Sequence, residues 1–92
     1  MTAAVLPERF RHGLELWIDE GVPPGSFLRR VLENDLYGAV VAADMQSRRE
    51  LSELVLWIAQ NAPPGSWGSP RAVIAWQEHM RRRLAERWGR MP

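Results

Sequence analysis

The chain has 92 residues, of which 46% are hydrophobic and 25% charged, and its net charge is +1. This length leaves room for one domain, over residues 1–92, and the composition excludes a disordered chain. The absence of cysteine excludes disulfides and thiolate chemistry, and no apolar run approaches the roughly 18 residues of a membrane span. The first residues lack the basic and apolar regions of a signal peptide, so we expect a cytoplasmic protein.

The first helix is predicted from about Pro7 to Glu20. Proline suits the first turn of a helix, because its missing N–H would have no partner there, and Gly21 suits the stop. The apolar side chains of this segment recur at helical spacing and form one face: Phe10, Leu14, Trp17 and Ile18.

A Pro-Pro-Gly-Ser hinge follows this helix and recurs 40 residues later. The two segments read LELWIDEGVPPGSF (residues 14–27) and LVLWIAQNAPPGSW (residues 54–67), with eight of fourteen positions identical. Because a proline disfavours helix in the residue before it, Val22 and Ala62 should leave their helices, and glycine then allows the chain to reverse. The repeat predicts two helix–hinge units with similarly angled corners, in each of which the hinge serine caps the next helix.

Ser26 is expected to cap a second helix that contains Phe27, Leu28, Val31 and Leu32. The sequence Asn34-Asp35 is a plausible break, in which case Asp35 caps a third helix from Leu36 to about Ala43. A continuous helix over residues 27–44 is the other interpretation. Both interpretations place the same apolar side chains in the core: Ala39, Val40 and Ala43.

The fourth and fifth helices have recognisable starts. Ser47-x-x-Glu50 fits a capping box, and Ser69-Pro70 combines a cap with a proline in the first turn. The apolar stripes are Leu51, Leu54, Val55, Ile58 and Ala62 in the fourth helix and Val73, Trp76, Met80, Leu84 and Trp88 in the fifth. No segment alternates polar and apolar residues over five or more positions. The sequence therefore predicts an all-α fold, a compact bundle of four to five helices.

The chain lacks the motifs of common catalytic and cofactor sites. Neither hinge serine lies in a G-x-S-x-G motif, and no glycine-rich phosphate loop is present. His12 and His79 lie among charged neighbours without the spacing of metal ligands, so we expect both on the surface. We predict no catalytic residue, no metal, no cofactor and no enzymatic activity.

Three of the five tryptophans lie on or beside helical stripes and are expected in the core: Trp17, Trp57 and Trp76. Trp67 lies in the second hinge, where it either packs over the corner or provides a secondary binding surface. A helix over residues 70–89 spans about 30 Å, against about 21–24 Å for neighbours of roughly 14–16 residues. Its last two turns should therefore overhang the bundle or cover its end, with Trp88 either exposed or packed on the first helix.

The end of the fifth helix is also the most basic part of the chain. Residues 1–47 carry four arginines and seven acids, whereas residues 48–92 carry eight arginines and four acids. At 100° per residue the terminal arginines surround the helix, so residues 81–92 are predicted to protrude as a basic helix end. The candidate macromolecule-binding residues are Arg81, Arg82, Arg83, Arg87, Trp88 and Arg90. An acidic protein surface, nucleic acid and solvent alone are the three alternatives for what this end contacts.

Several motifs resemble a group of small, uncharacterised helical proteins of phages and prophages. Residues 21–36 read GVPPGSFLRRVLENDL and are followed by Ala43-Asp44, where members read approximately G-x-P-x-G-[SG]-F-L-x-x-V-L-x-N-D-L and then A-D. Asn61-Ala62-Pro63 stands where members carry an N-x-A-P segment, and residues 66–70 read SWGSP as the members do. The resemblance covers about residues 13–76 and implies a mobile-element origin. The arginine-rich end beyond residue 80 departs from the short termini of the group.

Together these features predict a non-enzymatic phage or prophage accessory protein that binds a host or phage protein inside a bacterial cell. Inhibition of a host defence or regulatory protein is one form that this binding could take. The alternative is a nucleic-acid-binding protein that uses the arginine-rich C-terminal helix. We expect no membrane partner, and the sequence leaves homo-oligomers open.

Overall fold

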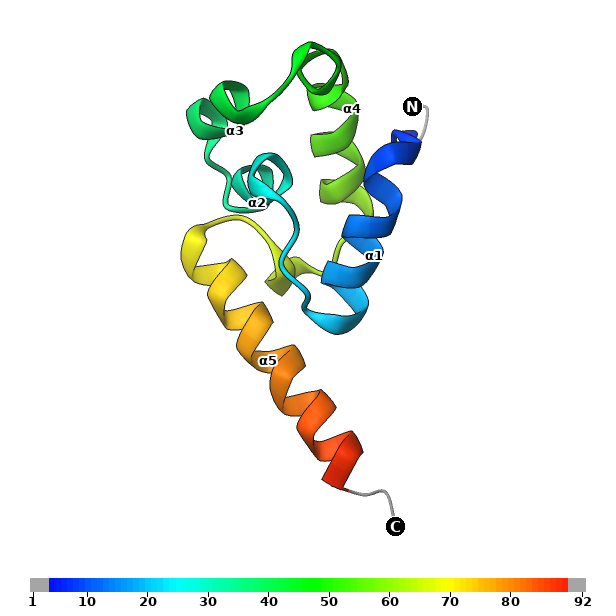
Figure 1. Ribbon diagram of the computed structural model, residues 1–92, viewed down its shortest axis with the longest axis vertical. Coiled ribbons are helices and arrows are strands. Elements are labelled where there is room, and N and C mark those ends of the chain that lie inside the picture. Colours follow the sequence, from blue (N-terminus) through cyan, green and yellow to red (C-terminus); the bar gives the residue numbers. More distant parts are fainter. Residues whose placement is uncertain (1–3, 90–92) are drawn as a thin grey trace.

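A computed structural model describes residues 4–89 and contains five α-helices and two short 3-10 helices (Figure 1). The α-helices are α1 (Arg11–Glu20), α2 (Ser26–Leu32), α3 (Leu36–Ala42), α4 (Met45–Asn61) and α5 (Pro70–Gly89). The 3-10 helices are η1 (Glu8–Phe10) and η2 (Pro64–Ser66). No strand occurs within these residues, so the predicted all-α fold is confirmed.

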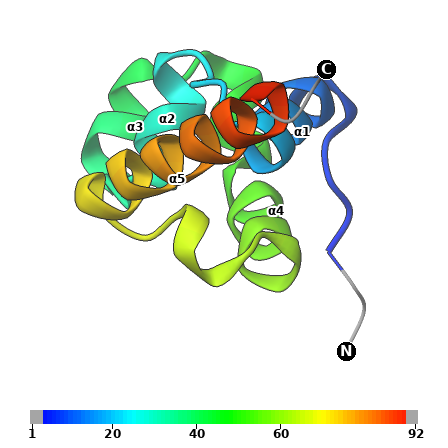
Figure 2. The same cartoon turned by 90° about the horizontal axis from the view of Figure 1, so that it is seen from below.

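The core lies between α1, α2, α4 and the first half of α5. Its most completely buried large side chains come from all four helices: Leu14, Trp17, Leu32, Leu54, Ile58 and Val73. Trp57 and Trp76 are partly buried and pack against this core. Burial of one such apolar side chain contributes about 1.5–3 kcal/mol, so these contacts hold the helices together. Seen from below, α5 crosses in front of the ends of α1 and α2 (Figure 2).

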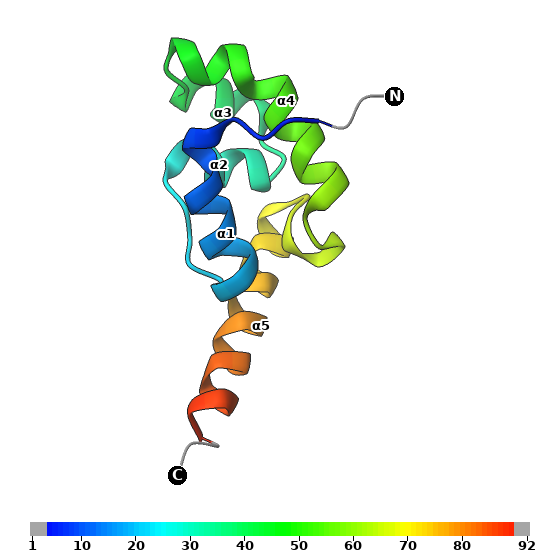
Figure 3. The same ribbon diagram turned by 90° about the vertical axis from the view of Figure 1, so that its right-hand side faces the viewer.

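The N-terminal segment lies across α4 (Figure 3). The backbone N–H of Ala4 donates to the side chain of Gln60 at 3.1 Å, and that of Val5 donates to the carboxylate of Glu53 at 3.3 Å. Leu6 is buried in the core. The segment therefore adds an apolar anchor and two hydrogen bonds to the contact between the N-terminus and α4.

α1 ends at Glu20 with Gly21 as its C-cap, as predicted, but it begins at Arg11 rather than near Pro7, because residues 8–10 form the 3-10 helix η1. Gly21 has a φ of +71°, in the left-handed region that favours glycine, and its N–H donates to the carbonyl of Trp17 at 3.0 Å. A Cβ at this position would lie 2.6 Å from the Cβ of Met80 in α5. Glycine is therefore required both by the backbone conformation and by the close approach of α5.

The two hinges have different backbone conformations, and the prediction that each hinge serine caps the next helix is wrong. In the first hinge Gly25 is the N-cap of α2, and Ser26 is the first helical residue and makes no capping hydrogen bond. In the second hinge the chain forms η2, and Ser66 Oγ donates to the carbonyl of Pro63 at 2.6 Å instead of capping α5. The physical cause is contact with α1, because the indole N–H of Trp17 donates to the carbonyl of the buried Ser66 at 2.9 Å.

A break separates α2 from α3, so residues 27–44 form two helices rather than one. Asn34 has a φ of +59°, a conformation that asparagine tolerates better than most residues. Asp35 caps α3 as predicted, because its Oδ1 accepts the N–H of Gly38 at 2.9 Å. A Cβ at residue 38 would overlap the Asp35 carboxylate, so the cap depends on this glycine.

α3 turns Ala39 inward and its larger side chains outward, while Ala42 is exposed. Ala39 is 1% exposed and Ala43 is also buried, as predicted. Val40 is 37% exposed, so its predicted place in the core is wrong. Each residue advances about 100° around a helix, and the inward position of Ala39 therefore turns Val40 toward the side of the helix.

The predicted start of α4 at a Ser47 capping box is wrong. Asp44 is the N-cap, and its Oδ1 accepts the N–H of Ser47 at 2.7 Å. Arg9 from η1 contacts Asp44 at 3.3 Å, Glu50 at 3.0 Å and the hydroxyl of Ser47, so Glu50 forms an ion pair instead of a capping box. The bond from the Ser47 backbone, followed by that from Arg9, lowers the pKa of Asp44 from 3.8 to about 2.

The start of α5 is as predicted, because Ser69 Oγ accepts the N–H of Ala72 at 3.0 Å. α4 ends at Asn61, so Ala62 leaves the helix before Pro63, also as predicted.

Within residues 4–89 no helix is both long enough and apolar enough to cross a lipid bilayer.

Candidate macromolecule-binding site

The first half of α5 is anchored to α1 and to the second hinge. Val73 and Met80 are buried, and the indole N–H of Trp76 donates to the carbonyl of Trp17 at 2.9 Å. The indole N–H of Trp17 donates in turn to the carbonyl of Ser66. These two hydrogen bonds link α5 to η2 through α1 and set the direction in which α5 leaves the bundle.

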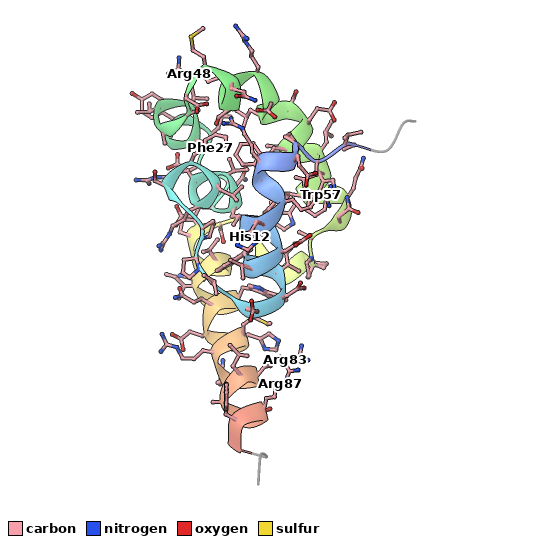
Figure 4. All side chains as sticks on the ribbon, turned by 45° about the vertical axis from the view of Figure 1, so that its right-hand side comes forward. His12, Phe27, Arg48, Trp57, Arg83 and Arg87 are labelled. Atoms are coloured by element: carbon pink, nitrogen blue, oxygen red, sulfur yellow. The ribbon has the colours of Figure 1, made fainter. Side chains whose placement is uncertain are left out.

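Beyond Met80, α5 extends away from the other helices (Figures 1 and 3). Residues 81–89 are exposed apart from Leu84, which is partly buried. Trp88 is 70% exposed, so most of its indole lies in solvent. Arg83 and Arg87 project from this end (Figure 4). The structure thus brings together the predicted residues of the helix end, except Arg90, which lies outside the described residues.

The arginines of this end have little opposing charge. Among residues 4–89, Arg81 pairs with Glu78 at 4.0 Å, and no carboxylate lies within ion-pair distance of Arg82, Arg83 or Arg87. An exposed pair at such a distance contributes little free energy. The positive charge is therefore available to an external partner.

A groove of about 780 Å³ lies between the end of α5, the end of α1 and the second hinge. Its apolar lining consists of Ile18, Pro63, Trp76, Met80 and Leu84, and its charged lining consists of Asp19, Arg83, Glu86 and Arg87. The apolar stripe predicted for the fifth helix therefore continues past the core into this groove.

Trp67, the secondary candidate, lies on a separate surface. It is partly buried and borders a pocket of about 130 Å³ together with Asn34, Asp35 and Leu36 from the α2–α3 break and Val55 from α4. The α2–α3 break and the second hinge are more than 30 positions apart in the sequence, so local patterns did not predict that they border one pocket.

Sequence reasoning also missed an apolar surface on α3. The exposed large side chains here are Leu36, Tyr37, Val40 and Val41, and Met45 continues the surface onto α4. Arg48 also lies at this end of the molecule, and its Nε donates to the carbonyl of Val40 at 3.2 Å (Figure 4). Both faces of α3 are uncharged, so the sequence pattern did not indicate which one packs inward.

The side chains of residues 4–89 form no arrangement suited to metal binding, since no group of three histidine, cysteine, aspartate or glutamate residues could hold an ion. His12 and His79 are both exposed, and the ring of His79 lies 5.5 Å from that of Trp76. The chemistry that the helix end offers is therefore charge and apolar contact.

No family model, curated protein or solved structure matches the chain.

Proposed function

We propose that the protein is a non-enzymatic phage or prophage accessory protein that binds a protein of its bacterial host or phage through the end of α5. The observation that carries this proposal is the 70% exposure of Trp88 on a helix end whose Arg82, Arg83 and Arg87 form no ion pair with any other residue of 4–89. Tryptophan and arginine are enriched among the residues that dominate the energy of protein interfaces. The phage origin rests on the resemblance of the motifs in residues 13–76.

The groove beside the helix end favours a protein partner over nucleic acid. The partly buried Trp76 and Leu84 give the groove apolar surface, and Asp19 and Glu86 lie there beside Arg83 and Arg87, so the groove carries both signs of charge. A nucleic acid backbone presents uniform negative charge and little apolar surface. An acidic protein surface with an apolar ridge would match the arginines and the groove together. Inhibition of a host defence or regulatory protein is one form of such binding.

Nucleic-acid binding is the second candidate, supported by the arginines that lack partners among the described residues: Arg82, Arg83 and Arg87. Arginines around a protruding helix can neutralise phosphates without any requirement for a groove. This function would depend on charge far more than on Trp88.

Capture of partners from a bacterial host lysate tests the proposal. We expect the wild-type chain to retain a discrete protein that Trp88→Ala does not retain. Ile74→Ala is the matched control, because Ile74 is a 56% exposed apolar residue of the same helix before the overhang. Full retention after truncation of the chain beyond Arg81 would contradict the proposal.

Titration of a labelled DNA or RNA oligonucleotide tests the alternative. Binding with a steep salt dependence would favour nucleic acid as the target. Neutralising Arg81, Arg82 and Arg83 should then reduce the salt slope by roughly one per lost phosphate contact. Salt-insensitive or undetectable binding would exclude this alternative.

A further inference from the structure

The face of α5 that packs against α1 continues past the end of α1. The indole N–H of Trp76 donates to the carbonyl of Trp17 at 2.9 Å, and a Cβ on Gly21 would lie 2.6 Å from that of Met80. These contacts place α1 against α5 as far as Met80. Leu84 follows four positions later, and residues four apart share one face of a helix. Beyond Gly21, no helix of residues 4–89 covers this face (Figures 1 and 3).

The groove along this uncovered face suits a helical segment better than an extended one. Its apolar surface comes from side chains that are partly buried: Ile18, Pro63, Trp76 and Leu84. A segment seated on such a surface loses water from its backbone N–H and C=O groups, which then need other partners. Residues 4–89 contain no strand whose edge could supply those partners. A helix bonds its own backbone internally and presents an apolar face to a groove.

The charges of the groove are sorted along its length. Asp19 lies two residues before Gly21, at the base of the groove, and forms no ion pair among residues 4–89. Arg83 and Arg87 project below the end of α1 (Figure 4). Residues 81–89 carry four arginines and one acid, Glu86. The groove is therefore negative at its base and positive on balance toward the end of α5.

We propose that the segment of the partner that occupies this groove is an amphipathic helix that continues the line of α1 along the end of α5. Its apolar side chains recur at i, i+4 and contact Leu84, its acidic side chains face Arg83 and Arg87, and a basic side chain faces Asp19. A second copy of the end of α5 does not fit, because it would set four arginines against four. This inference rests on the proposed function and adds the form and chemistry of the bound segment.

Selection of binders from a display library of random peptides on the immobilised wild-type chain tests the inference. Peptides of about 20 residues exceed the ~12–15 residues below which isolated helices are marginal. We expect enriched sequences with apolar residues at i, i+4 and acidic residues on one flank. Leu84→Ser should weaken the synthesised peptide at least about 30-fold, as loss of one interface anchor does. Ile74→Ser, at an exposed apolar position of α5 before the groove, should leave its affinity unchanged.

A charge reversal tests the acidic flank without altering a partly buried side chain. Replacing both Arg83 and Arg87 by glutamate should weaken the same peptide at least about tenfold. A second peptide with lysines in place of its acidic residues should bind this variant better than the wild-type chain. Replacing Arg81 and Arg82 by glutamate changes the charge equally but outside the groove lining, so it should weaken binding far less. Equal losses in the two double variants would overturn the inference.

Other results separate this inference from the proposed function. Trp88 does not line the groove. A lysate protein released by Trp88→Ala but retained by Leu84→Ser and by the Arg83 and Arg87 double variant would leave the function in place and overturn the helix in the groove. A selection that enriches no sequence, or only sequences without helical spacing, would also overturn it. A wild-type dimer that Leu84→Ser disrupts would identify a second copy as the occupant and overturn it too.

Discussion

Replacing Gly21 by alanine tests the joint between α1 and α5. The left-handed backbone costs an L-residue roughly 1–2 kcal/mol. The added Cβ would lie 2.6 Å from the Cβ of Met80, whereas carbon atoms prefer about 3.5–4.0 Å, so α5 must shift by about 1 Å. Overpacking of this kind costs about 1–3 kcal/mol. We therefore expect Gly21→Ala to lower the free energy of unfolding by about 2–5 kcal/mol, a large part of the about 5–15 kcal/mol of a typical domain.

Gly65 in the second hinge provides the matched control. It lies outside the left-handed region, and a Cβ there would meet no heavy atom within 4 Å. Gly65→Ala should therefore raise the free energy of unfolding by about 0.4–1 kcal/mol, by restricting the unfolded chain. Urea denaturation followed by tryptophan fluorescence measures both variants. A loss below about 1 kcal/mol for Gly21→Ala, or equal effects of the two substitutions, would refute the reasoning.

Three further predictions concern caps and the helix end. Asp35→Ala should lower the free energy of unfolding by about 0.5–2 kcal/mol through loss of the α3 cap, and an unchanged urea midpoint would contradict this role. Folding lowers the pKa of the Asp44 carboxyl group from 3.8 to about 2. The ionised group therefore contributes its full stabilisation of the fold above the unfolded-state pKa of 3.8, and this contribution is lost as the pH falls through about 2. Asp44→Asn should flatten that part of a pH–stability profile, and an unaltered profile would argue against the ion pair with Arg9. Trp88→Ala should weaken a captured protein partner by about 2 kcal/mol or more in calorimetry, with an unchanged unfolding midpoint, and an equal loss with Ile74→Ala would contradict a specific anchor.

The helical pattern of the sequence predicted the helices, but it did not predict every cap. Asp44 and Ser47 are both good capping residues and stand three positions apart. Asp44 also contacts Arg9, which is 35 positions away in the sequence. Local rules cannot weigh such a distant contact, so they misplaced the start of α4. The second hinge differs from the first for the same reason, through the bond from Trp17 to Ser66.

The candidate surfaces were predictable to different degrees. The length and charge of the last helix indicated a basic end, and Arg82, Arg83, Arg87 and Trp88 are indeed placed together there. The α3 surface was not predicted, because Val40 was expected in the core and no side was assigned to Leu36, Tyr37 or Val41. Every side chain of α3 is uncharged, so the sequence pattern alone does not define which face of this helix packs inward.

Because the end of α5 beyond Met80 has few contacts with the other helices, a small rotation of the helix at its base produces a larger displacement of its tip. Its nine residues beyond Met80 extend about 13 Å past the last buried contact, so a rotation of about 10° at the base would displace the tip by about 2 Å. A force that a bound partner applies at Trp88 would be transmitted along the helix to the hydrogen bond between Trp76 and Trp17 at its base. The orientation with which the tip meets a partner is therefore set at the base, and changes at Trp76 would alter recognition without touching the bound surface.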